Sequence, residues 1–461
     1  MTDKLLWVPH AWIGGQWLLG VCLTVNAQGV WSDITADVHS PPAHATVLSG
    51  PALPGLVNAH SHAFQRAFAG LSERRDSASD DFWSWRNRMY GVALRITADQ
   101  MRAVAAQLYI EMLKGGYTHV CEFHYLHHAE SGQPYDDPAT LSWATADAAA
   151  DAGIGLTLLP VLYERAGFTQ PALRDDQRRL AGTPGMIHNL YRAIQTSRRA
   201  LVNAGVAIHS LRAASRESIA QLVQIVGDDD VPIHLHIAEQ IREVDECLAA
   251  SGLRPIELLC QDFHPDSRWQ LIHATHATPG EVDSVARSGA GIVICPSTEA
   301  NLGDGMIDLP AWLAAKVPIA IGSDSQVSRN WAEELRWLEY GQRLFSQRRN
   351  VAAAPNFGQP ATAARLFDAV LCGGQHAAGA TPWGFVIGAR ADMLILDTQL
   401  PGLIGIPPSH ILDALIFASD GSAVRDVFVA GKQVVINGKH PLENQIARRF
   451  AEVMATLWGD L

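Results

Sequence analysis

The chain has 461 residues, of which 48% are hydrophobic and 18% are charged, and its formal net charge is −12. This composition is typical of a globular protein with a large core and excludes a disordered or membrane-embedded chain. The acidic balance argues against nucleic acid and anionic membranes as partners. An anionic small substrate would need arginines placed at its binding site.

Neither the cysteines nor the N-terminus indicates secretion. The six cysteines are scattered without a CxxC pair, which favours buried free thiols in a reducing compartment. The N-terminal MTDKLLWVPHAWIGGQW lacks a basic start followed by an uninterrupted apolar run. We therefore expect no secretion signal, no membrane span and a cytoplasmic location.

Both ends of the chain carry short alternating apolar segments. Residues 1–53 contain LLWVPHAWIGGQWLLGVCLTV and GVWSDI. Residues 383–440 contain ADMLILD and VRDVFVAGKQVVINGK, in which GK and NGK predict hairpin turns. We expect these two segments to form one small β-sandwich domain, followed by an amphipathic C-terminal helix over 441–461.

Residues 54–382 alternate short apolar runs with helical stretches such as ITADQMRAVAAQLYIEMLKGG. The apolar runs are PGLVNAH, THVCEFH, GLTLLPVLY, AGVAIHSLR, VPIHLHIAE, WQLIHATH, GIVICP and VPIAIGSD. Near-continuous apolar strands between helices predict the α/β class, with a TIM-like (β/α)8 barrel over these residues. Most of the runs end in a polar side chain, at the end where barrel enzymes place catalytic residues.

Two of these runs end in histidine pairs that are candidate metal ligands. His60 and His62 end the first run, and residues i and i+2 of a strand face the same way. The fifth run carries His234 and His236. We favour His236 as the ligand because Glu239 follows it where the chain leaves the strand, whereas His234 suits a structural or outer role.

An aspartate and a third histidine complete the predicted metal group. Asp324 follows the eighth run and suits a metal ligand, although it could instead cap the helix that begins in WAEELRWL. At the sixth run either His273 or His276 could be the active residue. Three nitrogens and one carboxylate suit Zn²⁺ with an open position for water. The fourth run does not end in a lysine that would bridge two ions, so we expect one zinc ion per chain.

The order of these motifs resembles the amidohydrolase superfamily, in its cytosine and guanine deaminase-like branch. The matching segments are PGLVNAHSH, the HxxE of the fifth run, the strand-ending histidine and GSD. The longer runs NAHSHAFQRAFAGL, CEFHYLHH, IHSLRAAS, HIAEQ and CPSTEANLGDG are similar to the N-formimidoyl-L-glutamate deiminases of bacterial histidine breakdown. The resemblance covers essentially the whole chain.

The resemblance implies a role for each candidate residue. The zinc ligands would be His60, His62, His236 and Asp324, and the proton-handling residues Glu239 and His273, with Asp324 taking part. The substrate contacts would be Gln65, Arg86, Tyr125, His209 and Arg212. Arg86 would reach the site of a neighbouring subunit, which implies a homodimer.

The implied activity is the zinc-dependent hydrolysis of N-formimidoyl-L-glutamate, a small anionic substrate, to N-formyl-L-glutamate and ammonia. Two alternatives stay open at this point. The chain could be a deaminase of the same fold acting on a nucleobase such as guanine or cytosine, since a fold does not fix a substrate. It could also be a barrel without catalytic activity that serves in binding.

Overall fold

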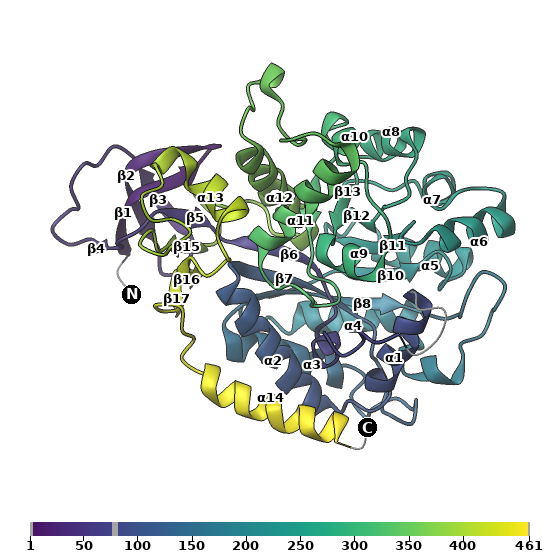
Figure 1. Ribbon diagram of the computed structural model, residues 1–461. Coiled ribbons are helices and arrows are strands. Elements are labelled where there is room, and N and C mark those ends of the chain that lie inside the picture. The colour runs from purple at the N-terminus through teal and green to yellow at the C-terminus, as the bar shows by residue number, and fades with distance from the viewer. Residues whose placement is uncertain (1–2, 76–81, 460–461) are drawn as a thin grey trace.

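The structure is a computed structural model that describes residues 3–75 and 82–459, and a parallel barrel forms its larger part (Figure 1). All eight predicted barrel strands are present and pair in parallel in chain order. They are β6 Leu56–Ser61, β7 Tyr117–His124, β8 Gly155–Leu162, β10 Val206–Ser210, β11 Ile233–Ile237, β12 Trp269–His273, β13 Gly291–Ile294 and β14 Ile319–Ile321. A short strand, β9 Val202–Ala204, pairs with β8 outside this order.

The barrel closes between its first and last strands. Ser61 at the end of β6 forms a parallel bridge with Asp324, which follows β14. The backbone N–H of His62 also donates to the carbonyl of Asp324 at 3.4 Å. The closing seam therefore lies at the strand ends where the sequence predicts metal ligands.

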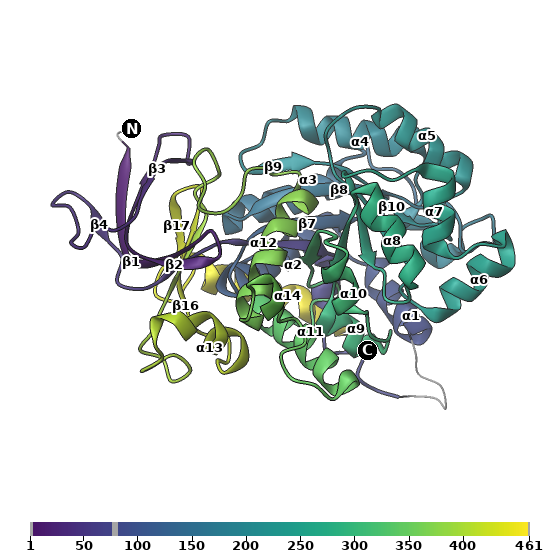
Figure 2. The same cartoon turned by 90° about the horizontal axis from the view of Figure 1, so that it is seen from above.

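Helices surround the barrel (Figure 2). They are α1 Phe82–Ala93, α2 Ala98–Lys114, α3 Thr140–Ala152, α4 Pro184–Thr196, α5 Arg216–Val226, α6 Ile241–Ser251, α7 Pro255–Phe263, α8 Pro279–Ser288, α9 Pro296–Leu302, α10 Leu309–Ala314, α11 Trp331–Ser346 and α12 Thr362–Ala378. Helix α2 begins where Thr97 and Gln100 form a capping box. Strand residues such as Leu235 and helix residues such as Leu222 pack in one buried apolar cluster between barrel and helices.

Strands from both ends of the chain form a second, mixed sheet, which confirms the expected β domain. Its strands are β1 Lys4–Ile13, β2 Gln16–Val25, β3 Trp31–Thr35, β4 Thr46–Val47, β5 Ala52–Pro54, β15 Met393–Leu396, β16 Val424–Val429 and β17 Lys432–Val435. β5 pairs with both β1 and β15, so the two ends are hydrogen-bonded into one continuous sheet. The GK turn joins β16 to β17, and Asn437 and Gly438 both take positive φ in the NGK turn.

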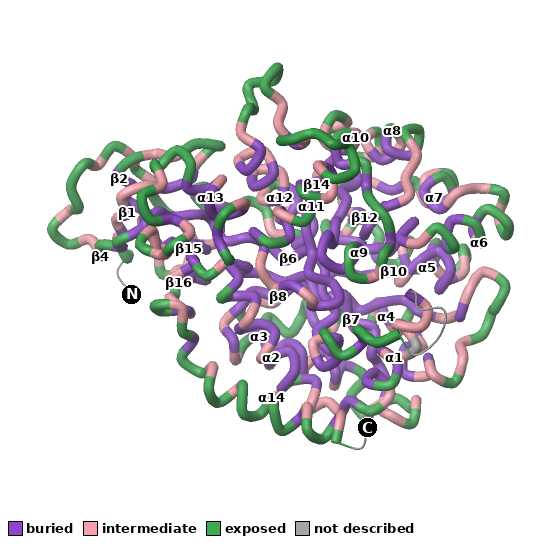
Figure 3. The backbone as a smooth tube through the Cα atoms, in the orientation of Figure 1, coloured by how far each residue is buried: buried purple, intermediate pink, exposed green. Residues whose placement is uncertain are grey.

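Two more α-helices of the described chain are not part of the ring of helices that surrounds the barrel. Helix α13 spans Ile411–Phe417, and α14, which spans Glu443–Trp458, lies along α2 (Figure 1). Along α14 the tube in Figure 3 is mostly exposed, whereas the barrel strands are buried. No helix in the described part of the chain is long and apolar enough to cross a membrane.

The cysteines are free thiols, as predicted, but not all are buried. Cys260 is half-buried and Cys372 is exposed, whereas the other four are buried. Cys372 lies in the last two turns of α12, where it faces away from the barrel core.

Candidate metal centre and active site

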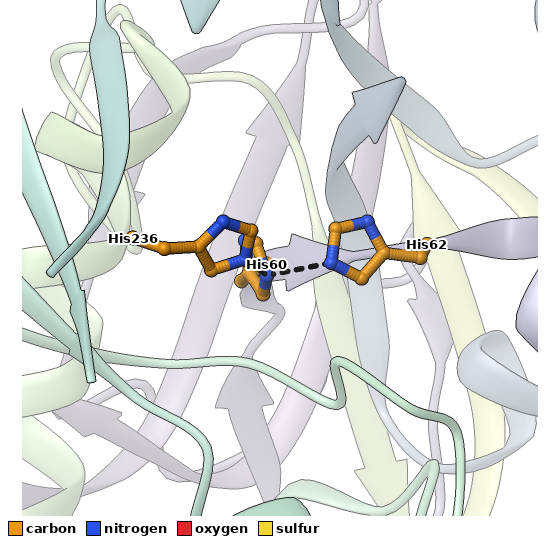
Figure 4. Close-up of side chains that lie close together, drawn as sticks. All are labelled: His60, His62 and His236. Carbon is orange, nitrogen blue, oxygen red and sulfur yellow. Dashed lines mark hydrogen bonds between the residues drawn. The ribbon is translucent and has the colours of Figure 1, made fainter. Parts of the chain in front are cut away.

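Three histidine side chains meet at the C-terminal end of the barrel, as Figure 4 shows. The Nε2 atom of His60, in β6, lies 3.1 Å from Nε2 of His62 and 3.0 Å from Nε2 of His236 in β11. All three side chains are buried. Ligand nitrogens around a tetrahedral zinc ion lie about 3.3 Å apart, because each Zn–N bond is about 2.0–2.1 Å long. The three nitrogens therefore have the spacing of ligands to one ion.

Backbone hydrogen bonds fix the protonation of two of these rings. Nδ1 of His62 lies 3.0 Å from the Phe123 carbonyl, and Nδ1 of His236 lies 2.9 Å from the His209 carbonyl. A carbonyl only accepts, so each Nδ1 donates and each Nε2 keeps a lone pair. Both lone pairs face Nε2 of His60, which can donate to only one of them. Burial lowers the pKa of His60 to about 3, so this ring is neutral. A cation bound between the three Nε2 atoms would give each of their lone pairs a partner.

Asp324 adds a carboxylate oxygen to the group. Its Oδ1 atom lies 3.3 Å from Nε2 of His62 and 3.6 Å from Nε2 of His60. Burial raises the pKa of Asp324, but the surrounding histidines, His60 first, outweigh burial and hold this pKa below its usual range. The alternative role of Asp324 as a helix cap is wrong, because Asn330 accepts the capping hydrogen bonds of α11.

The two histidines that the sequence left as alternatives lie elsewhere. Nε2 of His234 donates to the carbonyl of Ala377 in α12 at 2.9 Å. His276 is half-buried and lies against the loop at Gly305. Neither is among the described residues that line the pocket around the metal group.

His273 and Glu239 form an acid–base group beside Asp324. Nε2 of His273 lies 3.7 Å from a carboxylate oxygen of Glu239 and 3.7 Å from one of Asp324, while its Nδ1 lies 3.2 Å from Glu299. Burial lowers the pKa of His273, but these carboxylates, Glu239 foremost, raise it to about 10. Burial raises the pKa of Glu239 to about 7. A carboxyl group with a pKa near neutral can carry a proton during a reaction.

Unusual backbone conformations gather at the same strand ends. His273, Asp324 and Gln326 have φ values of 71°, 42° and 68°, and Ala238, next to Glu239, has a φ of 50°. Residues other than glycine seldom adopt positive φ, and such residues cluster at functional sites because surrounding contacts must hold them. The backbone conformations therefore indicate the same candidate functional site as the side chains.

One pocket joins the metal group to the five predicted substrate contacts. Gln65 comes from the short 3-10 helix η1 (Ala63–Ala67), and Arg86 comes from α1. Tyr125, His209 and Arg212 come from the ends of β7 and β10. The pocket is lined by His62, His236, Glu239, His273 and Asp324 together with Gln65, Arg86, Tyr125, His209 and Arg212.

Tyr125 and His209 lie directly against the metal group. The ring centroids of Tyr125 and His62 are 4.9 Å apart, and those of His209 and His236 are 5.0 Å apart. Nε2 of Gln65 donates to the Tyr125 hydroxyl at 3.0 Å. Burial holds the pKa of His209 well below its usual value, so its ring is neutral.

Arg86 and Arg212 bring guanidinium donors to the pocket wall. Arg212 is only 4% exposed. In both side chains Nε and Nη1 lack a hydrogen-bond partner among the described residues. Buried donors without partners are costly, so these groups suit a ligand that accepts several hydrogen bonds, such as a carboxylate. The resemblance implied that Arg86 serves a neighbouring subunit, whereas here Arg86 lines the pocket of its own chain.

Comparison with known proteins decides the family. The family model described as "Amidohydrolase family" matches residues 52–434. The chain belongs to the amidohydrolase family. Amidohydrolases are typically metal-dependent, which agrees with the ligand group at the strand ends.

The relatives of this amidohydrolase cover nearly all of the chain. It is 46% identical to the formimidoylglutamate deiminase of Pseudomonas aeruginosa over 98% of this chain and 99% of the relative. It is 27% identical to a 5-methylthioadenosine/S-adenosylhomocysteine deaminase of Natronomonas pharaonis, over 88% of each chain. The crystal structure of an amidohydrolase from Brucella melitensis matches with a TM-score of 0.92 and 40% identity, over 98% of this chain and 99% of that chain.

Two buried residues that were not predicted from the sequence hold the segments that carry the candidate ligands His62 and Asp324. Glu122 in β7 accepts hydrogen bonds from Ser61 Oγ at 2.8 Å and from the backbone N–H of Ala63 at 2.5 Å, on either side of His62. Gln326 donates to the carbonyl of Asp324 at 2.6 Å. Glu122 lies inside the EFH of the second run and Gln326 follows GSDS, so both adjoin predicted site residues.

Two further missed residues come from the segment CPSTEANLGDG, which the sequence analysis used only for the resemblance. Glu299 contacts His273, as described above, and also accepts a hydrogen bond from the backbone N–H of Cys295 at 2.9 Å. An oxygen of Asp304 lies within 4.8 Å of ligand-type atoms of Glu239 and His273. The site therefore holds more buried carboxylates than the motifs predicted.

Proposed function

We propose that this amidohydrolase catalyses the zinc-dependent hydrolytic deimination of N-formimidoyl-L-glutamate to N-formyl-L-glutamate and ammonia in histidine degradation. One observation carries the proposal: the candidate metal ligands His62, His236 and Asp324 line the same pocket as Arg86 and Arg212, two arginines whose Nε and Nη1 atoms lack hydrogen-bond partners among the described residues. The substrate has a hydrolysable amidine at one end and two carboxylates at the other. The 46% identical relative is a formimidoylglutamate deiminase, which supports the same reaction.

We propose one zinc ion per chain, held by His60, His62, His236 and Asp324. Three imidazole nitrogens and one carboxylate oxygen suit Zn²⁺ and leave a position open. Bound there, zinc would act as a Lewis acid and make hydroxide available from water near neutral pH. Elemental analysis should find about one divalent ion per chain, and two tightly held ions would contradict the proposal.

Each side chain around the proposed ion has its own role in the proton transfers. Asp324 accepts the proton of the attacking water, and His273 orients the water and stabilises developing charge. The bond from water oxygen to the formimidoyl carbon forms first. Glu239 gives its proton to the terminal nitrogen as the carbon–nitrogen double bond opens, so this nitrogen becomes an amino group. The proton held by Asp324 then passes to the amino nitrogen, the bond from that nitrogen to carbon breaks and ammonia leaves, while the remaining hydroxyl proton returns to Glu239 as the carbonyl forms. The net change is that water and the amidine yield N-formyl-L-glutamate and ammonia.

The other contacts hold the substrate for this step. Arg212 and Arg86 suit the two carboxylates, because a planar guanidinium binds a carboxylate with paired hydrogen bonds. Tyr125 and His209 contact the candidate ligands His62 and His236, and Gln65 donates to Tyr125. These three residues suit the polar atoms between the carboxylates and the amidine.

An ammonia-release assay tests the function directly. The metal-loaded protein should release ammonia from N-formimidoyl-L-glutamate far faster than from guanine, cytosine or 5′-methylthioadenosine. The last substrate is included because a 27% identical relative is a 5-methylthioadenosine/S-adenosylhomocysteine deaminase. Preferred turnover of a nucleobase or nucleoside would overturn the proposal, and stoichiometric zinc without turnover of any substrate would favour a binding protein.

We also propose a homodimer in which Arg86 of one subunit completes the site of the other. Because Arg86 lines the pocket of its own chain in the structure, an exchange of α1 between subunits would keep the same contacts. Mixing inactive Arg86→Ala and Glu239→Gln subunits tests this arrangement. Activity returns if Arg86 acts across subunits, because one site of the mixed dimer is then intact. Failure to return in verified mixed dimers would show that Arg86 serves its own chain.

A further inference from the structure

A second pocket lies against the outer side of the catalytic pocket. Both pockets are lined by Arg86 and Arg212, so these two side chains stand in the wall between them. The outer pocket also contains Arg174, Arg242 and the indole of Trp83. Neither the resemblance nor the proposed mechanism uses these three residues.

Three of the four arginines that line the outer pocket gather around one aromatic ring. The guanidinium carbons of Arg86 and Arg242 lie 4.4 Å and 4.5 Å from the ring centroid of Trp83, and that of Arg212 lies 5.7 Å from it. A cation within about 6 Å of an indole is attracted to its face. Trp83 therefore holds three positive groups together that would otherwise repel each other.

The outer pocket is positive on an acidic protein. Four arginines line it, against the two carboxylates of Asp176 and Glu246, whereas the whole chain has a net charge of −12. Arg242 pairs with Glu246 at 2.7 Å on α6, and Arg174 pairs with Asp176 at 3.0 Å. Arg242 is exposed and the other three side chains are partly exposed. Ion pairs that water reaches contribute little, so an arriving anion can replace these partners.

We propose that the outer pocket is a capture site for the dicarboxylate end of the substrate, and that Arg242 is a specificity-determining residue within it. This inference rests on the proposed function for the identity of the substrate. A dicarboxylate would first meet Arg242 in the outer pocket and then pass its carboxylates to the buried donors of Arg212 and Arg86. Local positive charge raises the rate of such an encounter, and the effect weakens as salt rises.

Glutarate binding and kinetics on metal-loaded Arg242→Gln test the proposal. Glutarate is a suitable probe because it has two carboxylates and no amidine. At low salt the variant should bind glutarate about three- to tenfold more weakly and lose a similar factor in kcat/KM, mainly through KM. Both differences from the wild type should shrink as ionic strength rises.

Arg449→Gln is the matched control. Arg449 lies on α14, its side chain is 58% exposed against 60% for Arg242, and it also pairs with a glutamate one turn away, Glu452. The control removes the same charge outside the pocket and should change neither quantity. An Arg242→Gln protein that behaves like this control would overturn the capture site.

The glutarate measurement separates the two proposals. Glutarate binding that depends on Arg242, without turnover of N-formimidoyl-L-glutamate by the wild type, would support the capture site and overturn the proposed substrate. Normal turnover with glutarate binding unaffected by Arg242→Gln would overturn the capture site and support the proposed substrate.

Discussion

The backbone N–H of Asp324 donates to the carbonyl of His60 at 3.0 Å, so two proposed metal ligands are fastened to each other through the main chain. The two residues lie at opposite ends of the barrel sequence, in the first strand and after the last. The same contact closes the barrel, because Ser61 and Asp324 form the bridge between these strands. The relative positions of the proposed metal ligands therefore depend on how rigidly this contact between the first and last strands is held.

The Gln326 side chain links the end of β6 to the residues that follow β14. Its replacement should therefore weaken metal binding. Its Nε2 donates to the Asp324 carbonyl at 2.6 Å and to Ser61 Oγ at 3.1 Å, and its Oε1 accepts from Ser323 Oγ at 2.7 Å. Gln326→Ala should lower the affinity for zinc by about 10–100-fold, as is typical when residues that orient metal ligands are lost. Competition with a chelator measures this affinity.

Gln342→Ala is the control for this prediction. Gln342 is also buried and donates to a backbone carbonyl, that of Ile307, but it lies on α11 away from the metal group. Both variants should lose some stability, and only Gln326→Ala should lose zinc. An unchanged zinc affinity in Gln326→Ala would mean that the seam holds its shape without this side chain.

The barrel strands and the ends that carry ligands could be predicted from the sequence. Buried parallel strands appear as continuous apolar runs, and His60 and His62 share a face because strand residues alternate. The structure confirms all eight strands and groups both histidines with His236.

The residues that support the ligands could not be predicted in the same way. Gln326 contacts Ser61 across 265 residues of sequence, so neither spacing nor periodicity links them. Which pocket Arg86 lines likewise depends on where α1 packs. The Trp-rich segment FWSWRNRMY does not specify that packing position. The domain boundaries and the dimer stay predictions.

Glu239→Gln should keep the metal and lose most turnover, by roughly two or more orders of magnitude, because the amide has no transferable proton. The pH profile gives a second measurement. Glu239 donates its proton, and its pKa is raised to about 7. The active protonated form is thus present below about pH 7 and is lost as the pH rises through this value, so wild-type kcat should fall above pH 7.

Glu217→Gln, an exposed substitution at the start of α5, is the control and should keep the wild-type profile. Near-normal kcat in Glu239→Gln with zinc bound would show that another group supplies the proton.

Arg212→Met should chiefly weaken the capture of substrates that carry the glutamate carboxylates. Removing one partner of a charge-assisted contact in a closed site costs about 2–5 kcal/mol in kcat/KM. N-propylformamidine, which has the amidine but no carboxylate, should lose much less. Equal losses on both substrates would show that Arg212 holds the site together and does not recognise carboxylates.

The last prediction concerns which carbon–nitrogen bond breaks. Addition of water gives a tetrahedral carbon with two nitrogens, one that leaves as ammonia and one that belongs to glutamate. Both are amines of similar basicity, so intrinsic leaving ability does not decide, and the nitrogen that receives the proton of Glu239 leaves. Arg212 and Arg86 stand in the wall toward the outer pocket, whereas Glu239 and His273 lie beside Asp324. Carboxylates bound at the arginines would therefore place the terminal nitrogen deepest, next to Glu239. We expect ammonia and N-formyl-L-glutamate, which NMR distinguishes from formamide by their different formyl signals. Formamide with one equivalent of glutamate would refute the deiminase reaction and leave the membership of the amidohydrolase family intact.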